Sequence, residues 1–231
     1  EMLVILPFEK DFYKKHQVNA HFVGHPLLDA ISDLAPIDAE NFKKEYGLND
    51  KEIIALLPGS REQEVEKMLS LMLSVRDYFK NYQFVIAGAP SLPKEFYQKF
   101  VDDDVHFVSN KTYDLLRCSK AALVTSGTAT LETALLNVPE IVCYRTSTIS
   151  YEIGKRVVKN IKFISLVNLI MDREIVKELI QKELNTENLV NELQKILEGQ
   201  KRDKMLKNYE LLREKLGGKG ASEHAAEIIV N

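Results

Sequence analysis

The chain has 231 residues, enough for one large hydrophobic core or two modest ones, and its 45% hydrophobic and 28% charged residues are ordinary for a soluble globular protein. A net charge of −3 gives no reason to expect nucleic acid as a partner, and no apolar run approaches the roughly 20 residues of a membrane span. The two cysteines, Cys118 and Cys143, lack paired spacing, which fits a reduced compartment and argues against a zinc site or a disulfide framework.

Apolar runs that resemble strands recur along the chain and alternate with helical patterns. They cover residues 2–6, 20–24, 53–57, 83–87, 105–108, 121–125 and 140–144. The runs 53–57 and 121–125 are apolar throughout, as in strands that helices cover on both faces. This alternation predicts an α/β fold with a doubly wound parallel sheet. Beyond Phe163 we expect helices, with Thr186 and Ser222 as candidate N-caps.

The first 36 residues indicate a boundary between two domains. The chain begins with Glu1, and a strand-like run follows at once, so we expect a fragment whose N-terminal portion is absent. Residues 1–24 would then be the tail of a truncated first domain, and residues 25–36 the crossing. Residues 37–231 would form the main α/β domain with its C-terminal helices. We expect His25, in the crossing, to hydrogen-bond the backbone of its turn.

Two small, hydroxyl-bearing turns each follow an apolar strand and precede a helix. They are Pro58-Gly59-Ser60-Arg61 and Ser126-Gly127-Thr128, and Thr130 adds a further hydroxyl. At the carboxyl edge of one parallel sheet, the two helix N-termini would face one crevice, and their free N–H groups suit a diphosphate. Neither turn is a P-loop, and the chain contains no Gly-x-Gly-x-x-Gly fingerprint.

Two charged residues after these turns have alternative interpretations. The Arg61 guanidinium can bind phosphate oxygens bidentately, or it can pair with Glu64 or Glu66 on the surface. Glu132 can accept hydrogen bonds from a ribose diol, or it can simply complement the helix dipole. Residues 149–163 form a basic amphipathic pattern, typical either of a helix on an anionic lipid surface or of an ordinary packed helix.

Several blocks of the sequence together resemble lipid-A-disaccharide synthase. They are residues 23–29, 57–61, 125–132, 144–145, 165–170 and 178–181, and the similarity covers nearly the whole chain in order. The resemblance implies the two-domain glycosyltransferase B fold, with this chain as its C-terminal nucleotide-sugar-binding portion. It also implies transfer of diacylglucosamine from its UDP conjugate to the 6-hydroxyl of diacylglucosamine 1-phosphate, with inversion and without a metal ion or other cofactor.

The resemblance and the turns together give a set of expected substrate-binding residues. These are Gly59, Ser60, Arg61, Ser126, Gly127, Thr128, Thr130, Glu132 and Asn168. The family implies that Arg61 stabilises the charge on the departing UDP, that Glu132 binds the ribose hydroxyls and that Asn168 lies in a loop bordering the cleft. An inverting transfer also needs a base, which we expect in the absent N-terminal half. The fragment alone is therefore expected to be inactive.

The expected partners are UDP-diacylglucosamine and diacylglucosamine 1-phosphate. We expect a cytoplasmic location, and the sequence leaves open both peripheral contact with the inner membrane and a homodimer. Two other functions compete with a hexosyltransferase. One is a UDP-N-acetylglucosamine 2-epimerase-like enzyme, whose acid/base carboxylates and His-Arg elements we do not find. The other is a non-catalytic nucleotide-binding module, because binding can survive when half of a cleft is absent.

Overall fold

The computed structural model describes residues 1–101, 105–146 and 162–230. Its main element is a six-stranded parallel sheet in the spatial order β5-β4-β3-β6-β7-β8. The strands are β3 (Glu52–Leu57), β4 (Tyr82–Gly88), β5 (His106–Ser109), β6 (Ser119–Thr125), β7 (Glu140–Tyr144) and β8 (Lys177–Ile180). Numbered by their entry into the sheet, they follow the 3-2-1-4-5-6 order of doubly wound folds, with the reversal between β3 and β6. The predicted α/β class is confirmed.

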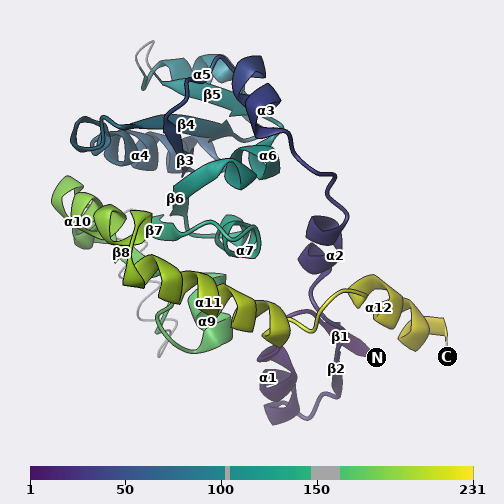
Figure 1. Cartoon of the computed structure of the whole chain (residues 1–231). Helices are drawn as coiled ribbons and strands as arrows, with labels where there is room; N and C mark the ends of the chain where they lie inside the picture. Colours follow the sequence, from purple (N-terminus) through teal and green to yellow (C-terminus); the bar gives the residue numbers. More distant parts are fainter. Residues whose placement is uncertain (102–104, 147–161, 231) are drawn as a thin grey trace.

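Helices cover both faces of this sheet (Figure 1). They are α3 (Ala39–Glu45), α4 (Glu62–Leu73), α5 (Lys94–Gln98), α6 (Thr112–Arg117), α7 (Thr128–Leu135), α9 (Leu166–Met171), α10 (Thr186–Leu197) and α11 (Gln200–Lys215), with short 3₁₀ turns η1 (Arg76–Tyr78) and η2 (Gln181–Glu183). Because successive side chains of a strand point to opposite faces of the sheet, β3 contributes to a hydrophobic core layer on each face. Ile54 and Leu56 join the core cluster that contains α4 and α10, whereas Ile53 and Ala55 join the one that contains Phe42 of α3.

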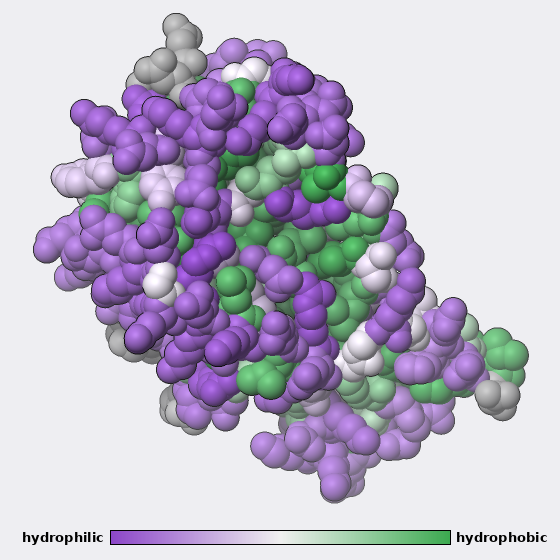
Figure 2. Space-filling model, in the orientation of Figure 1, coloured by the Kyte–Doolittle hydropathy of each residue, from purple (hydrophilic) through white to green (hydrophobic). Residues whose placement is uncertain are grey.

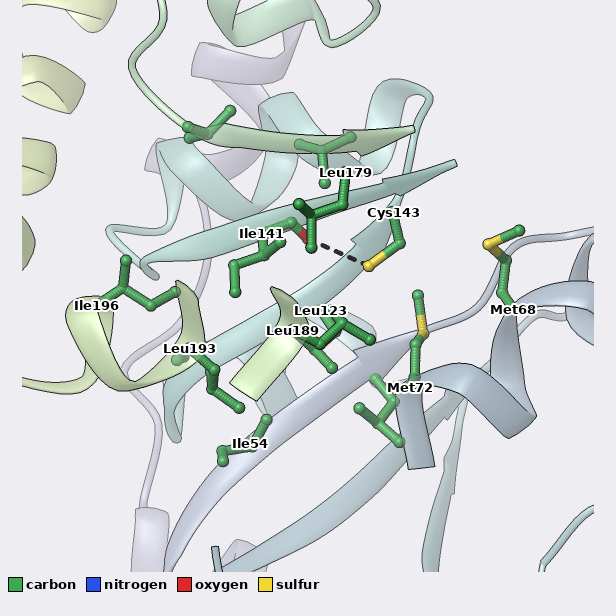
Figure 3. Close-up of a cluster of buried hydrophobic side chains, with 14 of the residues drawn as sticks. Ile54, Met68, Met72, Leu123, Ile141, Cys143, Leu179, Leu189, Leu193 and Ile196 are labelled. Carbon is green, nitrogen blue, oxygen red and sulfur yellow. Dashed lines mark hydrogen bonds between the residues drawn. The ribbon is translucent and has the colours of Figure 1, made fainter. Parts of the chain in front are cut away.

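Figure 3 shows the larger of these two core layers. Met68 and Met72 of α4 recur every four residues and therefore lie on one face of the helix. Leu189, Leu193 and Ile196 of α10 follow the same helical spacing and are fully buried. These two apolar faces meet the strand side chains from the same side of the sheet, which fixes how α4 and α10 lie across it.

Strand β8 corrects the expectation that the chain is only helical beyond Phe163. It extends the sheet beside β7, with Ile141 opposite Lys177. The strand has only four residues and begins with Lys177 and Glu178, so it contains no apolar run that periodicity could detect. Long-range pairing with β7 therefore decides its structure. Helix α10 also differs slightly, because the side chain of Asn185 rather than Thr186 caps it.

The two ends of the described chain meet outside the main sheet (Figure 1). There β1 (Met2–Val4) and β2 (Ala20–Phe22) form a separate parallel pair connected through α1 (Glu9–Lys15), and α2 (Pro26–Ser32) follows. The C-terminal helix α12 (Ala221–Val230) returns to α2. Asp29 accepts hydrogen bonds there from the backbone N–H groups of Gly220 and Ser222, at 2.7 and 3.2 Å. That residues 1–24 belong to a further domain stays a prediction.

His25 has the structural role expected of it. Its Nδ1 accepts a hydrogen bond from the Leu27 N–H at 3.2 Å and thereby caps α2. The ring is buried, and this burial lowers the pKa of His25, so the ring stays neutral and can accept. The turn that connects β2 to α2 is therefore held by a side chain from within the crossing itself.

Three findings concern membranes and metal ions. None of the helices in the described parts of the chain combines the length and apolarity that crossing a bilayer requires. Nearly all of the basic amphipathic pattern at 149–163 lies outside the described residues. No group of three or more His, Cys, Asp or Glu side chains arranged to hold a metal ion occurs within the ranges that the structure describes.

Candidate functional site

A cavity of about 300 Å³ opens at the carboxyl ends of β3, β4 and β6. Its lining consists of Leu57, Gly59, Ser60, Glu64, Ala87, Gly88, Ala89, Thr112, Thr125, Ser126, Gly127, Thr128, Ala129 and Glu132. Strands β3 and β6 are neighbours here, and the strand order reverses between them. Open α/β sheets bind their ligands at such a switch point. The prediction that the two turns face one crevice is thus confirmed.

Figure 2 shows how residue types are distributed over one face of the molecule. Hydrophilic residues cover its periphery, and apolar residues gather in the middle, around α7 and α2 of Figure 1. Helix α2 packs against α7, the helix that begins at the cavity. The crossing segment therefore contacts the helix that begins at the cavity.

The first turn binds a carboxylate from its own helix. Glu64 accepts a hydrogen bond from the Ser60 N–H at 3.0 Å and another from Arg61 Nη1 at 3.1 Å. Gly59 has φ +120°, and a Cβ there would lie 2.6 Å from Cβ and Oε2 of Glu64, so this close approach requires glycine. The surface pairing that the sequence offered as an alternative for Arg61 is thus present in the structure.

Arg61 does not line the cavity, and its side chain is largely exposed to solvent. It is 82% exposed, against 33% for Glu64. An exposed pair of this kind contributes only about 0.2–1 kcal/mol. The guanidinium can therefore exchange the Glu64 carboxylate for a stronger anion at little cost.

In and after the second turn, the hydroxyls of Ser126 and Thr130 already have partners within the protein. Ser126 Oγ donates to the Ile164 carbonyl at 2.9 Å, and Thr130 Oγ1 donates to the Gly127 carbonyl at 2.8 Å. Thr130 is fully buried and does not line the cavity, so the structure does not place it where a substrate bound there could touch it. The N–H groups of Thr128 and Ala129, in the first turn of α7, have no partner within the helix and lie at the cavity.

Glu132 lies in the wall of the cavity with a partner that the sequence did not reveal. The Tyr113 hydroxyl, from the first turn of α6, donates to Glu132 Oε1 at 2.8 Å. Burial, with the Glu132 carboxylate adding to it, raises the pKa of Tyr113, so the hydroxyl stays protonated. Helix α6 starts at the same edge of the sheet as the two turns, which is the signal that could have pointed to it.

Asn168 is a correction to the expected site. It lies in α9 rather than in a loop, and its side chain is fully buried. Its Nδ2 donates to the Val176 carbonyl and to Glu178 Oε1, while its Oδ1 accepts from the N–H groups of Ile175 and Val176. These contacts use all its hydrogen-bonding capacity within the protein, so Asn168 holds α9 against β8 instead of bordering the cavity.

One buried carboxyl group lies away from the cavity, at the start of β7. Glu140 is fully buried, and no hydrogen-bond partner for its carboxyl oxygens occurs in the described part of the chain. Burial raises the pKa of Glu140 well above its usual range, and the nearby Glu178 adds to the shift. This group is relevant to stability rather than to the candidate site.

Sequence comparison gives a consistent family signal. A family model described as lipid-A-disaccharide synthetase matches residues 1–230. Lipid-A-disaccharide synthase of Syntrophus aciditrophicus is 39% identical over 97% of this chain and 61% of its own length. The Myxococcus xanthus protein of the same name is 35% identical over 99% of this chain and 61% of its own length. The chain thus spans about three-fifths of the relatives it matches.

Structural comparison gives the same architecture. UDP-GlcNAc 2-epimerase from Neisseria meningitidis, solved with UDP-GlcNAc, matches with a TM-score of 0.68 at 16% identity, over 99% of this chain and 60% of that one. WaaG, a glycosyltransferase involved in lipopolysaccharide biosynthesis, matches with a TM-score of 0.58 at 17% identity, over 98% and 62%. At these identities the likeness shows the fold alone.

Proposed function

The chain belongs to the lipid-A-disaccharide synthetase family, and from this membership we propose that it forms the nucleotide-sugar-binding part of an inverting hexosyltransferase. The transferase moves diacylglucosamine from its UDP conjugate to diacylglucosamine 1-phosphate. The observation that carries the proposal is the cavity at the switch point, where two strand–turn–helix units come together with the carboxylate of Glu132 in the wall. A structural neighbour bound to UDP-GlcNAc supports a nucleotide sugar as the ligand of this architecture.

The diphosphate binds between the two turns. The N–H groups of Thr128 and Ala129 face it from α7, with the positive end of that helix dipole behind them. On the other side it replaces the Glu64 carboxylate as the partner of the Ser60 N–H and of Arg61. The Arg61 guanidinium then stabilises the charge that develops on the departing UDP, the task that a divalent cation has in other transferases.

The nucleoside extends toward Glu132, whose carboxylate accepts hydrogen bonds from the ribose hydroxyls. An inverting transfer also needs a base that takes the proton of the acceptor hydroxyl. In the described lining of the cavity the only carboxylates are Glu64 and Glu132, and both already have other roles. We therefore place the base outside this lining, and we expect the chain by itself to bind the donor without transferring sugar.

Both substrates of the proposed reaction carry acyl chains. A cytoplasmic enzyme that handles them gains from peripheral contact with the cytoplasmic face of the inner membrane. The basic amphipathic pattern at 149–163 is the segment of the sequence that suits such contact. Binding of the chain to anionic vesicles, compared with a variant in which the lysines and arginine of this segment are replaced by glutamine, tests this part separately.

Calorimetric titration of the chain tests the proposed ligand. We expect UDP and its acylated glucosamine conjugate to bind, and glucosamine 1-phosphate without uridine to bind much more weakly. Equal binding of the sugar phosphate and UDP would contradict the proposal and favour a general phosphate-binding module. Conversion of UDP-N-acetylglucosamine to its 2-epimer would favour the epimerase alternative instead.

A further inference from the structure

We propose that Tyr113 is a positioning residue that orients the Glu132 carboxylate and thereby gives the site its selectivity for ribonucleotides. The inference rests on the proposed function, because it takes the ribose diol as the ligand of Glu132. Tyr113 acts through Glu132 rather than on the ligand itself. Thr112 and Glu132 line the cavity, whereas Tyr113 is not part of the lining and bonds to Glu132.

The contact joins two separate parts of the cavity wall. Tyr113 belongs to α6, which follows β5, and Glu132 belongs to α7, which follows β6. The hydroxyl and Glu132 Oε1 are 2.8 Å apart, a normal distance for a hydrogen bond donated to a carboxylate. Tyr113 is half-buried and Glu132 lines the cavity, so the bond holds a carboxylate of the lining by a side chain outside it.

A vicinal diol requires a carboxylate in a defined orientation. A glutamate side chain has several rotatable bonds, so ordering it for a ligand costs conformational entropy. The hydrogen bond from Tyr113 orders the Glu132 side chain before the ligand binds. It uses one acceptor position of Oε1 and leaves Oε2 and the remaining position of Oε1 for two ribose hydroxyls. Since Tyr113 stays protonated, the orientation persists across the neutral pH range.

A merely structural role would make a different prediction. If the bond only joined α6 to α7, its loss would disturb the whole cavity wall and weaken every nucleotide alike. If it orients Glu132, its loss weakens only those ligands that offer hydroxyls to the carboxylate. The comparison of UDP with 2′,3′-dideoxy-UDP separates the two, because the dideoxy compound keeps the base and the diphosphate.

The test is calorimetry on Tyr113→Phe with both nucleotides. We expect the Kd for UDP to rise about 10- to 30-fold, because the ligand must then order the Glu132 side chain itself, and the Kd for 2′,3′-dideoxy-UDP to stay unchanged. Tyr82→Phe is the matched control, since it removes a hydroxyl from another half-buried tyrosine at the amino end of β4. An equal loss for both nucleotides, or no loss for UDP, overturns the proposal.

Two further measurements secure the interpretation. In a Glu132→Gln background, Tyr113→Phe should have little additional effect on UDP, because the two residues act as one unit. If Tyr113→Phe does not fold, Glu132→Asp tests the same bond by withdrawing the carboxylate from the hydroxyl, and full ribose selectivity in that variant refutes the role of Tyr113. A wild-type chain that binds UDP and its dideoxy analogue equally instead refutes the ribose role of Glu132, and the role of Tyr113 with it.

Discussion

Replacing Glu64 by Gln is expected to tighten the binding of UDP. In the ligand-free chain the Glu64 carboxylate accepts from the Ser60 N–H and from Arg61, the donors that we assign to the diphosphate. The amide oxygen of Gln can still accept from Ser60, so the turn and the start of α4 should keep their structure. What the substitution removes is a negative charge that competes with the ligand.

The size of the effect follows from two contributions. Arg61 and Glu64 form an exposed pair, and releasing Arg61 from it recovers about 0.2–1 kcal/mol. Repulsion between the carboxylate and a phosphate charge about 4 Å away contributes about 1 kcal/mol per unit charge in the dielectric of water. Together these give about 1–2 kcal/mol, or roughly a 5- to 30-fold lower Kd for UDP.

Calorimetry at low salt measures the change, and Glu62→Gln provides the matched control. Glu62 is an exposed acid in the first turn of the same helix, and it does not line the cavity. Its replacement changes the net charge equally, and we expect at most about a twofold effect from it. If Glu64→Gln weakens UDP binding, Glu64 holds Arg61 ready for the ligand rather than occupying its place, and the reasoning fails.

Three other predictions concern the site and the core. Arg61→Ala should weaken UDP binding by about 1.5–3 kcal/mol. Lys67→Ala, in the helix α4 that follows Arg61, is the control and should not weaken it. If calorimetry gives Arg61→Ala the same UDP affinity as the wild type, Arg61 does not bind the diphosphate. Asn168→Ala should lower the free energy of unfolding by about 2–4 kcal/mol in urea titrations, yet leave the UDP affinity of the folded protein unchanged, because its contacts are internal. Burial holds the pKa of Glu140 well above its unfolded value, so its stabilising contribution is fully present below about pH 4.5 and is lost as the pH rises toward the folded-state pKa. Glu140→Gln should therefore be more stable than the wild type at pH 7.5 and show a shallower pH dependence; identical slopes would show that Glu140 does not titrate in this way.

The position of the cavity explains why residues that are distant in the sequence form one site. Both turns follow strands at the centre of the sheet, and the reversal of strand order between β3 and β6 leaves a crevice there that no connecting helix covers. The same topology carries α6 to this edge. Residues from three strand–helix units therefore meet although they are distant in the sequence.

Local patterns in the sequence determined most of the fold. The buried strands 53–57 and 121–125, the apolar face of α4 and the two glycine-containing turns depend on spacing and turn chemistry within a few residues, so the sequence alone was enough to predict them. The convergence of the two turns also followed, because parallel strands bring their carboxyl ends to one edge. The cap formed by His25 is equally local, since its partner is two residues away.

Only the tertiary structure decided the partners of polar side chains that bond to residues distant in the sequence. Tyr113 and Glu132 are 19 residues apart and meet because β5 and β6 belong to one sheet. The family resemblance assigned Asn168 to a loop bordering the cleft, but the pairing of β8 with β7 surrounds it with backbone groups that only the fold brings there. A polar residue offers the same donors and acceptors in a core, on a surface or at a site. The type of residue, which the sequence gives, determines which hydrogen bonds are possible. Long-range packing determines which of them form.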